Sequence, residues 1–221
     1  MSLRHALLAL LEAGPMTGYE LAKQFDVSVD YLWHAPHSQI YPELRRMEAA
    51  GLVEAESLPR GERATKRPYS LTAAGAEELV AWVRRQETAP PVRDPAYLKA
   101  TYFEYESFDE TRQHFREHRD HHRAVQEHWQ RHISRLQQHD TALMRRRLER
   151  GPEAAHEAIV AFKVHAYEGL VDRARAEVAW AERGLALVDR LEHRSSVPAG
   201  EPVLLPLVLR DGDTPEGALE I

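Results

Sequence analysis

Cysteine is absent from this 221-residue sequence. The chain therefore has no disulfides, no thiolate metal ligands and no cysteine nucleophile. It also lacks the uninterrupted run of roughly 18 apolar residues that a membrane-spanning helix needs. The apolar stretch Leu3–Leu11 is short and has neither a basic leader nor a small-residue cleavage site, so it indicates a first helix and not a signal peptide. We predict a cytoplasmic protein with no membrane partner.

Signatures of catalysis are missing as well. We find no phosphate-binding glycine loop, no Gly-x-Ser-x-Gly, no His-Glu-x-x-His and no carboxylate pair in a strand-loop context. The sequence thus predicts a protein that is not an enzyme and needs no cofactor. A histidine-rich helical hydrolase is the alternative, and a stoichiometric metal required for turnover would favour it.

A net positive charge is also lacking, since the formal charge is −6. This counts mildly against a nucleic-acid partner, because phosphate binding needs positive potential. The local distribution is different. Arg45 and Arg46 are adjacent, and residues 60–67 carry one acid, Glu62, among four cations, which are Arg60, Arg63, Lys66 and Arg67. Such a patch can bind DNA with strong salt sensitivity.

The first ninety residues have the order of a winged helix-turn-helix. The segment Thr17-Gly-Tyr-Glu20 has the form of a capping box that starts a second helix. A third helix is expected over Ser38–Ala50, with Gly51 as its stop and Pro42 in its first turn. Two short strands, Leu52–Glu56 and Arg67–Leu71, flank a polar turn and predict a hairpin, after which Thr72 caps a fourth helix.

The third helix carries the pattern most informative about function. Helical periodicity puts Ile40, Leu44 and Met47 on one side, which we expect to be buried. In a helix-turn-helix, the second helix of the motif enters the major groove. The opposite side then offers candidates for base contacts, namely Ser38, Gln39, Tyr41, Pro42 and Arg45. Candidates for backbone contacts in the head and wing are Thr17, Tyr19, Lys23, Arg46, Arg60, Arg63, Lys66 and Arg67.

Three segments of this region resemble the PadR family. They are His37-Ser-Gln-Ile-Tyr-Pro-Glu-Leu-Arg-Arg-Met-Glu-Ala-Ala-Gly-Leu-Val53, the preceding Gly14-Pro-Met-Thr-Gly-Tyr-Glu-Leu21 and the following Lys66-Arg-Pro-Tyr-Ser-Leu-Thr-Ala-Ala-Gly75. Where the family usually has glycine, this chain has Ser38. The resemblance implies a dimeric repressor that binds a pseudo-palindromic operator, with DNA contacts by Gln39, Tyr41, Pro42 and the wing. It also implies a small aromatic effector.

The second half is predicted to be helical and to pair two chains. A capping box at Ser107–Glu110 opens a helix expected to reach about Arg150, and Gly151-Pro152 separates it from a helix ending near His193. Helices of about forty residues span roughly 60 Å, too long to bury their apolar faces against a ninety-residue head. Candidate dimerisation residues are Leu3, Leu7, Phe115, Trp129, Leu136, Phe162, Leu185 and Val188.

The predicted fold is therefore mainly α: a winged helix-turn-helix head with a two-stranded β wing, plus a long-helix C-terminal dimerisation domain. We expect the DNA-binding domain over residues 1–88, a linker over 89–95, a helical dimerisation and effector domain over 96–194, and a tail of unknown role over 195–221. An effector site is hypothesised around four aromatic residues, Trp129, Phe162, Tyr167 and Trp180. Such a stripe is more often core.

Two further interpretations stay open at this point. A winged helix can bind protein instead of DNA, because one fold hosts many functions. The histidines His114, His118 and His122 share a helical face and could chelate Zn²⁺ or Ni²⁺, but no acid is placed as a further ligand, so we predict no metal site and a solvated helix face.

Overall fold

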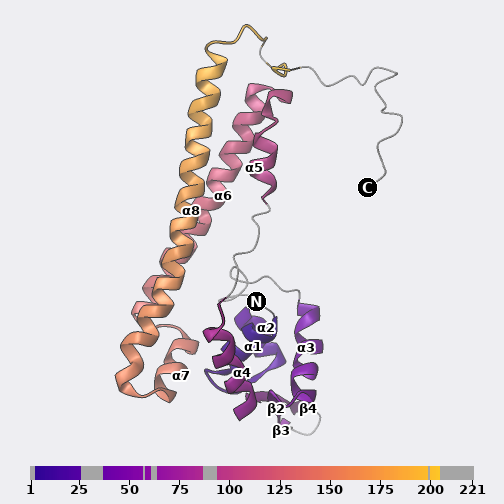
Figure 1. The fold of residues 1–221 in the computed structure, drawn as a ribbon, viewed down its shortest axis with the longest axis vertical. Coiled ribbons are helices and arrows are strands. Elements are labelled where there is room, and N and C mark those ends of the chain that lie inside the picture. Colours follow the sequence, from indigo (N-terminus) through magenta and orange to yellow (C-terminus); the bar gives the residue numbers. More distant parts are fainter. Residues whose placement is uncertain are drawn as a thin grey trace, which may run out of the picture. The chain divides into compact units, whose positions relative to one another are not determined.

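The structure is a computed structural model that describes residues 3–25, 37–56, 58–60, 64–86, 94–198 and 200–204. It confirms the predicted mainly α fold with a winged-helix head and a long-helix second half (Figure 1). The chain divides into two compact units, which we describe separately. The head unit is Met1–Ala89 with Ile133–His165, and the helical unit is Pro90–His132 with Ala166–Ile221.

The head unit begins with the expected alternation of helices and strands. Its elements are α1 (Leu3–Leu11), β1 (Met16–Thr17), α2 (Gly18–Gln24), α3 (His37–Ala49), β2 (Val53–Ala55), β3 (Leu58–Arg60), β4 (Ala64–Lys66), β5 (Pro68–Leu71) and α4 (Ala73–Arg84). The local signals act as expected. The Thr17 hydroxyl accepts from the Glu20 amide at 3.2 Å, the Gly75 amide donates to the Thr72 hydroxyl at 3.1 Å, and Gly51 ends α3 with a φ of 71°.

The strands form a three-stranded antiparallel sheet and a separate hairpin. The sheet order is β1-β5-β2, with Val53 opposite Leu71 and Met16 opposite Tyr69. Strands β3 and β4 pair with one another as a two-stranded wing. The hairpin of β2 and β5 confirms the prediction. Strand β1 has only two residues, too few for a detectable alternation, and the sequence did not reveal it.

The core of the head unit forms where α1, α3 and the sheet meet. Leu7, Ile40, Leu44 and Met47 are all 0% exposed and belong to one continuous apolar cluster. Burying side chains of this size contributes roughly 1.5–3 kcal/mol each to folding. The apolar stripe of α3 therefore fixes that helix against the rest of the unit, which determines the direction of its opposite face.

The helical second half differs from the prediction at one point. It contains α5 (Pro95–Ala100), η2 (Phe103–Tyr105), α6 (Phe108–Gln137), α7 (Ala142–Arg150), η3 (Glu153–Ala155) and α8 (His156–Glu192). The predicted single helix from Ser107 to Arg150 is wrong, because the chain turns between α6 and α7. His139 adopts a φ of 54° there, and the Thr141 hydroxyl caps α7 by accepting from the Met144 amide at 3.1 Å.

Helix α7 belongs to the head unit and packs within it. Leu143 joins the apolar cluster of the head, and Arg147 Nε lies 3.0 Å from Oε2 of Glu12, the residue that follows α1. The turn before α7 therefore supplies the head unit with residues from far along the sequence. The first segment of this unit ends at Ala89, and Ile133–His165 are added to it.

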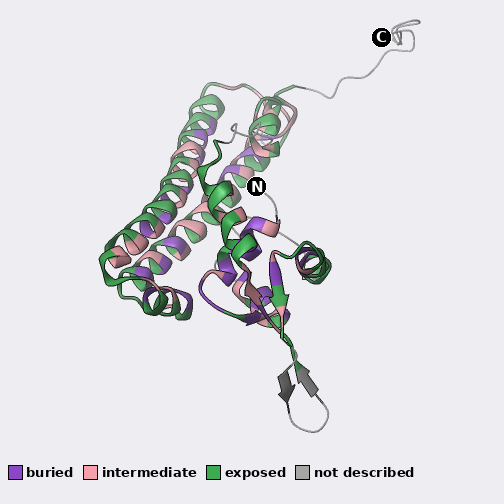
Figure 2. Cartoon of the chain, turned by 60° about the horizontal axis from the view of Figure 1, so that its bottom comes forward, coloured by how far each residue is buried: buried purple, intermediate pink, exposed green. Residues whose placement is uncertain are grey.

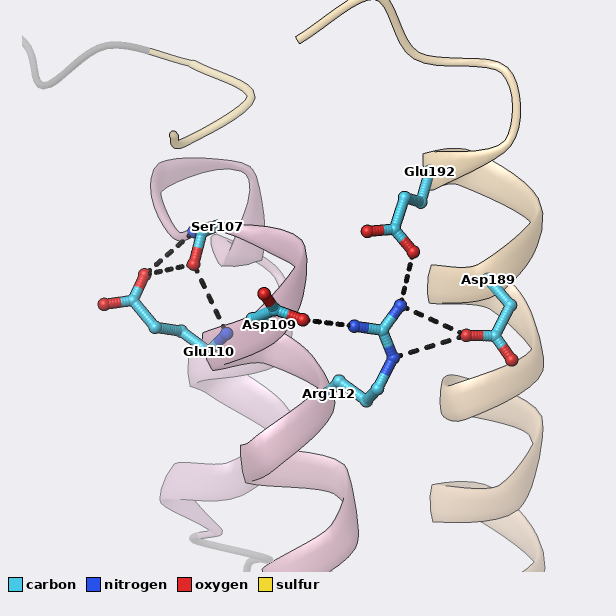
Figure 3. Close-up of polar contacts among 6 residues, drawn as sticks. All are labelled: Ser107, Asp109, Glu110, Arg112, Asp189 and Glu192. Carbon is cyan, nitrogen blue, oxygen red and sulfur yellow. Dashed lines mark hydrogen bonds and ion pairs between the residues drawn. The ribbon is translucent and has the colours of Figure 1, made fainter. Parts of the chain in front are cut away.

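The helical unit is held together by facing side chains of α6 and α8. Arg112 extends from α6 and contacts Asp189 and Glu192 of α8, while also binding Asp109 on its own helix (Figure 3). The expected capping box forms beside it, since the Ser107 amide donates to Glu110 Oε2 at 2.9 Å. Buried and exposed positions alternate along both long helices (Figure 2). None of the described helices is long and apolar enough to cross a membrane.

Candidate nucleic-acid interface

The outward face of α3 is polar and open to solvent. Ser38, Gln39, Pro42 and Arg45 are exposed, and Tyr41 is 46% exposed. Because the opposite stripe is fully buried, this face cannot turn toward the interior. The orientation matches the prediction, and the side chains present hydroxyl, amide and guanidinium groups that can read base edges.

Pro42 lies deeper in the helix than expected. We predicted it in the first turn, but α3 begins at His37, which makes Pro42 the sixth residue of the helix. Proline has no amide proton, so the Ser38 carbonyl lacks the partner it would have in a regular helix. The exposed start of α3 therefore carries a backbone acceptor in addition to its side chains.

Tyr41 is positioned by a glycine that the sequence analysis did not single out. A Cβ added at Gly18 would lie 2.5 Å from Cε1 of the Tyr41 ring, so only glycine allows this approach. The contact brings the ring against the first residue of α2. Gly18 appeared in the sequence only as part of a capping box, and nothing in that motif indicates a contact with α3.

The expected contact residues on α2 and at its N-cap divide into two kinds. Tyr19 is 72% exposed and Lys23 is exposed, so both side chains are accessible to a ligand. The Thr17 hydroxyl is occupied in the capping box, where it also donates to Glu20 Oε2 at 2.8 Å. The Thr17 backbone hydrogen bond lowers the pKa of Glu20, and nearby Lys66 lowers it further. Glu20 is therefore anionic at neutral pH.

Four cations of α3 and the wing that we expect to contact DNA have described side chains, and three of them already have acidic partners or lie beside one. Arg46 binds Glu43, Arg67 Nη2 lies 2.7 Å from Glu48 Oε1, and Lys66 Nζ lies 3.5 Å from Glu20 Oε1. Arg45 is the exception. It has no hydrogen bond or ion pair with any residue that the structure describes. A phosphate would have to replace an acid at the three paired positions, but not at Arg45.

Glu43 is an acid that the sequence pattern did not flag. It is only 7% exposed, and Arg4 Nε donates to its Oε1 at 3.2 Å while Arg46 binds its other oxygen. Glu43 lies between buried positions of α3, so a buried carboxylate with two arginine partners links that helix to α1.

Two of the wing cations expected to contact DNA have no described side chain. Arg63 lies outside the described residues, and of Arg60 only the backbone is described.

Comparison with known proteins identifies this arrangement. Residues 7–81 match the transcriptional regulator PadR-like family. The negative transcriptional regulator PadR of Bacillus subtilis is 34% identical over 116 residues, covering 52% of this chain and 64% of that protein. Residues 7–81 therefore form a domain of the PadR-like family.

Solved structures of Bacillus subtilis PadR are similar over most of their length. The crystal structure in complex with operator DNA has a TM-score of 0.66 at 27% identity, covering 85% of this chain and 97% of that chain. The complex with p-coumaric acid gives 0.57 at 29% identity, covering 85% and 98%. Because these PadR-family relatives are regulators, they confirm the prediction that the chain is not an enzyme.

The four aromatic residues suggested for an effector site are not gathered in one place. Trp129 and Tyr167 are buried side by side, with ring centroids 5.1 Å apart, and burial raises the pKa of Tyr167 to about 12. Trp180 packs against Phe115 with centroids 5.2 Å apart. Phe162 belongs to the head unit and is 76% exposed. Trp129 and Tyr167 are thus core residues of the helical unit.

A cavity of about 400 Å³ lies elsewhere in the helical unit. Its wall is mostly apolar, with one cation and one acid, and includes Phe103, Glu104, Phe108, Phe115, Leu187 and Arg194. No sequence pattern indicates this cavity, because η2, α6, α8 and Val203 of the tail meet there from distant parts of the chain. The backbone supports this meeting, since the Leu204 amide donates to the Glu104 carbonyl at 2.7 Å.

Most residues proposed for dimerisation are buried within one chain. Leu7 is 0% exposed, Trp129 and Leu136 are 1% exposed, and Phe115 and Val188 are 6% and 3% exposed. These five side chains stabilise their own chain, and we correct their assignment, because a side chain already enclosed cannot contact a partner. Leu3 packs partly buried on the head core, and Leu185 packs partly buried in the helical unit. Phe162 remains accessible.

Proposed function

We propose that this chain is a sequence-specific transcriptional regulator that binds a pseudo-palindromic operator as a homodimer and acts as a repressor. The observation that carries the proposal is the open polar face of α3, fixed from behind by Ile40, Leu44 and Met47, all 0% exposed. A helix anchored in this way can enter the major groove without rearrangement of the head. The complex of Bacillus subtilis PadR with operator DNA supports it.

The exposed groups would make two kinds of contact with DNA, to base edges and to the backbone. Ser38 and Gln39 can hydrogen-bond to base edges, and Arg45 can reach guanine or a phosphate. Tyr41, resting against Gly18, can donate to a phosphate or pack on a thymine methyl. Tyr19, Lys23 and the wing cations would contact the backbone, which fixes register but carries no sequence information.

The proposed functional domains follow the predicted boundaries. Residues 1–88 would bind DNA, 89–95 would connect, and 96–194 would pair the chains and take the effector. Support for pairing comes from accessible apolar side chains on the second half, among them Leu98 at 66%, Tyr102 at 58% and Phe162 at 76% exposure. Pairing of two chains would remove such apolar side chains from water, which favours association.

We further propose that a small aromatic carboxylate binds in the cavity of about 400 Å³ and releases the operator. The aromatic wall suits a planar ring, and Arg194 can pair with a carboxylate. Bacillus subtilis PadR has been solved with p-coumaric acid, which supports an effector of this chemistry. Titrating the operator complex with p-coumarate tests this, with Arg194→Ala expected to weaken the release.

Selection of bound sequences from a random duplex library tests DNA binding and symmetry together. The full chain should enrich two half-sites related by a two-fold axis, with centres about 10 base pairs or 34 Å apart. Tyr41→Ala should then weaken operator binding by about tenfold, or roughly 1.4 kcal/mol, without changing the dimer mass. Gln113→Ala, at an exposed polar position of α6, serves as the control and should bind normally.

The alternative of a protein-interaction module gives a different result. A folded dimer that enriches no sequence would overturn the DNA-binding proposal and favour a protein partner. Unchanged affinity of Tyr41→Ala would show that α3 does not face the duplex as proposed.

A further inference from the structure

The histidine-rich part of α6 divides into two environments. His114 Nε2 lies 3.2 Å from Glu106 Oε1, and its ring stacks on Phe103 with centroids 5.5 Å apart. One and two turns further on, His118 and His122 lie close together, with ring centroids 4.4 Å apart. The three histidines share a helical face in the sequence, but only two of them converge in the fold.

The missing acidic ligand comes from α8. Glu177 Oε2 lies 3.0 Å from His118 Nε2, and one nitrogen of each histidine and an oxygen of Glu177 all lie within 4.8 Å of one another. His118 and Glu177 have side chains only 14% and 15% exposed. The sequence could not place this carboxylate, because 55 residues separate it from His122.

This set of donors has the chemistry of a transition-metal site. Two imidazoles at i, i+4 spacing with one carboxylate are common Zn²⁺ ligands, and zinc takes a fourth ligand from water at an open position. Metal–ligand bonds of about 2.0–2.2 Å place neighbouring ligand atoms of a tetrahedral site roughly 3.3 Å apart. His118 Nε2 and Glu177 Oε2, 3.0 Å apart, are already near that value, and no pair in the cluster exceeds 4.8 Å.

We propose that His118, His122 and Glu177 form a binding site for a divalent transition-metal ion, with Zn²⁺ as the preferred occupant. The site lies between α6 and α8 within the helical unit and does not depend on the proposed regulatory function. Hard cations such as Mg²⁺ favour all-oxygen ligands, so a site with two imidazole nitrogens discriminates against them.

Two features around the cluster support the assignment. The Tyr97 hydroxyl of α5 donates to Glu177 Oε2 at 2.8 Å, and such outer contacts orient a ligating carboxylate. A cavity of about 260 Å³ borders His118 and Trp180, which gives an ion and its water a route to the cluster. The Trp180 ring packs on His118 with centroids 4.9 Å apart and limits its movement.

The test uses the full chain without an affinity tag, stripped with a chelator and then titrated with Zn²⁺ against a chromophoric competitor. One ion should bind per chain with an affinity well above that for Mg²⁺, and Zn²⁺ should raise the unfolding temperature. Substituting Co²⁺ should give the visible absorption of a four-coordinate ion.

Matched variants separate the site from the other histidines. His122→Ala and Glu177→Gln should each lower Zn²⁺ affinity by at least tenfold, and Tyr97→Phe by about tenfold to a hundredfold. His114→Ala, one turn away on the same face of α6, should leave the affinity unchanged. Thermal unfolding of each metal-free variant shows whether it folds, and the exposed His121→Ala provides a second control.

The proposal fails if the stripped chain binds no stoichiometric Zn²⁺. It also fails if His122→Ala and Glu177→Gln bind as tightly as the unaltered chain, or if His114→Ala loses affinity equally. In the last case the histidines would bind metal only as a diffuse surface cluster.

Discussion

The head unit and the helical unit use the same kind of apolar periodicity with different outcomes. In α3 the stripe Ile40, Leu44 and Met47 is buried and the opposite face is open, as predicted. In α6 the stripe containing Phe115, Trp129 and Leu136 is also buried, but within its own chain, so it is not available to a partner. Periodicity shows which face of a helix is covered, and it does not show which chain covers it.

The largest expected difference is in the free energy of unfolding, between substitution of a buried and of an exposed apolar residue of the head unit. Leu7→Ala should lower the free energy of unfolding by about 2–5 kcal/mol, since it opens a cavity in a closed core. Phe162→Ala should leave that free energy nearly unchanged, because the ring is 76% exposed. Urea denaturation measures the free energy of unfolding. Sedimentation at several protein concentrations measures the dissociation constant of the dimer, which we expect only Phe162→Ala to raise.

Two glycines, one in each unit, allow a clash with backbone to be compared with a clash with a side chain. A Cβ at Gly75 would lie 2.0 Å from the Leu52 carbonyl oxygen, whereas one at Gly184 would lie 2.4 Å from the Phe115 ring. Backbone cannot move aside as a ring can. We expect Gly75→Ala to cost about 3 kcal/mol and Gly184→Ala about 1 kcal/mol, as higher helix propensity offsets part of the second clash. Equal costs in denaturant titrations would contradict this.

The two capping boxes provide a pH-dependent comparison. Backbone hydrogen bonds from Thr17 and Ser107 lower the pKa of Glu20 and of Glu110, respectively. A lowered pKa in the folded state stabilises above the unfolded value near 4.5, and that stabilisation disappears as the pH falls through the folded value. Glu20→Gln should therefore cost about 0.5 kcal/mol at pH 7 and less at pH 3. Stability curves against pH, with Glu110→Gln alongside, measure both boxes.

The smallest expected effect concerns the acids that pair with cations of the proposed DNA surface. Glu48→Gln removes the charge that binds Arg67, so operator affinity should rise a few-fold. The slope of log affinity against log salt should steepen by up to about 0.9 if Arg67 gains a phosphate. Glu54→Gln, at an exposed position of β2, is the matched control. An unchanged slope would remove Arg67 from the proposed contacts.

Local signals explain how much of the head could be predicted. The capping threonines, Gly51 and the stripe of α3 each specify structure within one or two turns, and all were identified from sequence. Strand β1 and the contact of Gly18 with Tyr41 depend on residues far apart in sequence. The position of Pro42 was mispredicted, because a proline one turn into a helix is tolerated when its outer face is solvated.

For the second half of the chain, the sequence did not show which helices pack against one another. The turn at His139 sends α7 to the head, and no sequence period signals a left-handed residue there. The cavity lined by Phe103 and Arg194 and the convergence of Glu177 with His118 arise only when α6 and α8 come together. A contact between two segments far apart in the chain leaves no local sequence pattern, whereas the start of a helix does.

The packing of α7 on the core of the head unit has a consequence for dissecting the molecule. Cleavage in the segment around residue 90 would not release a complete head, because Leu143 and the Arg147 partner of Glu12 would leave with the other fragment. On the ribosome, too, the amino-terminal ninety residues emerge before the piece that completes their surface has been synthesised. An isolated amino-terminal fragment should thus be less stable than the same residues in the intact chain, and supplying residues 133–165 as a separate peptide should restore part of the loss.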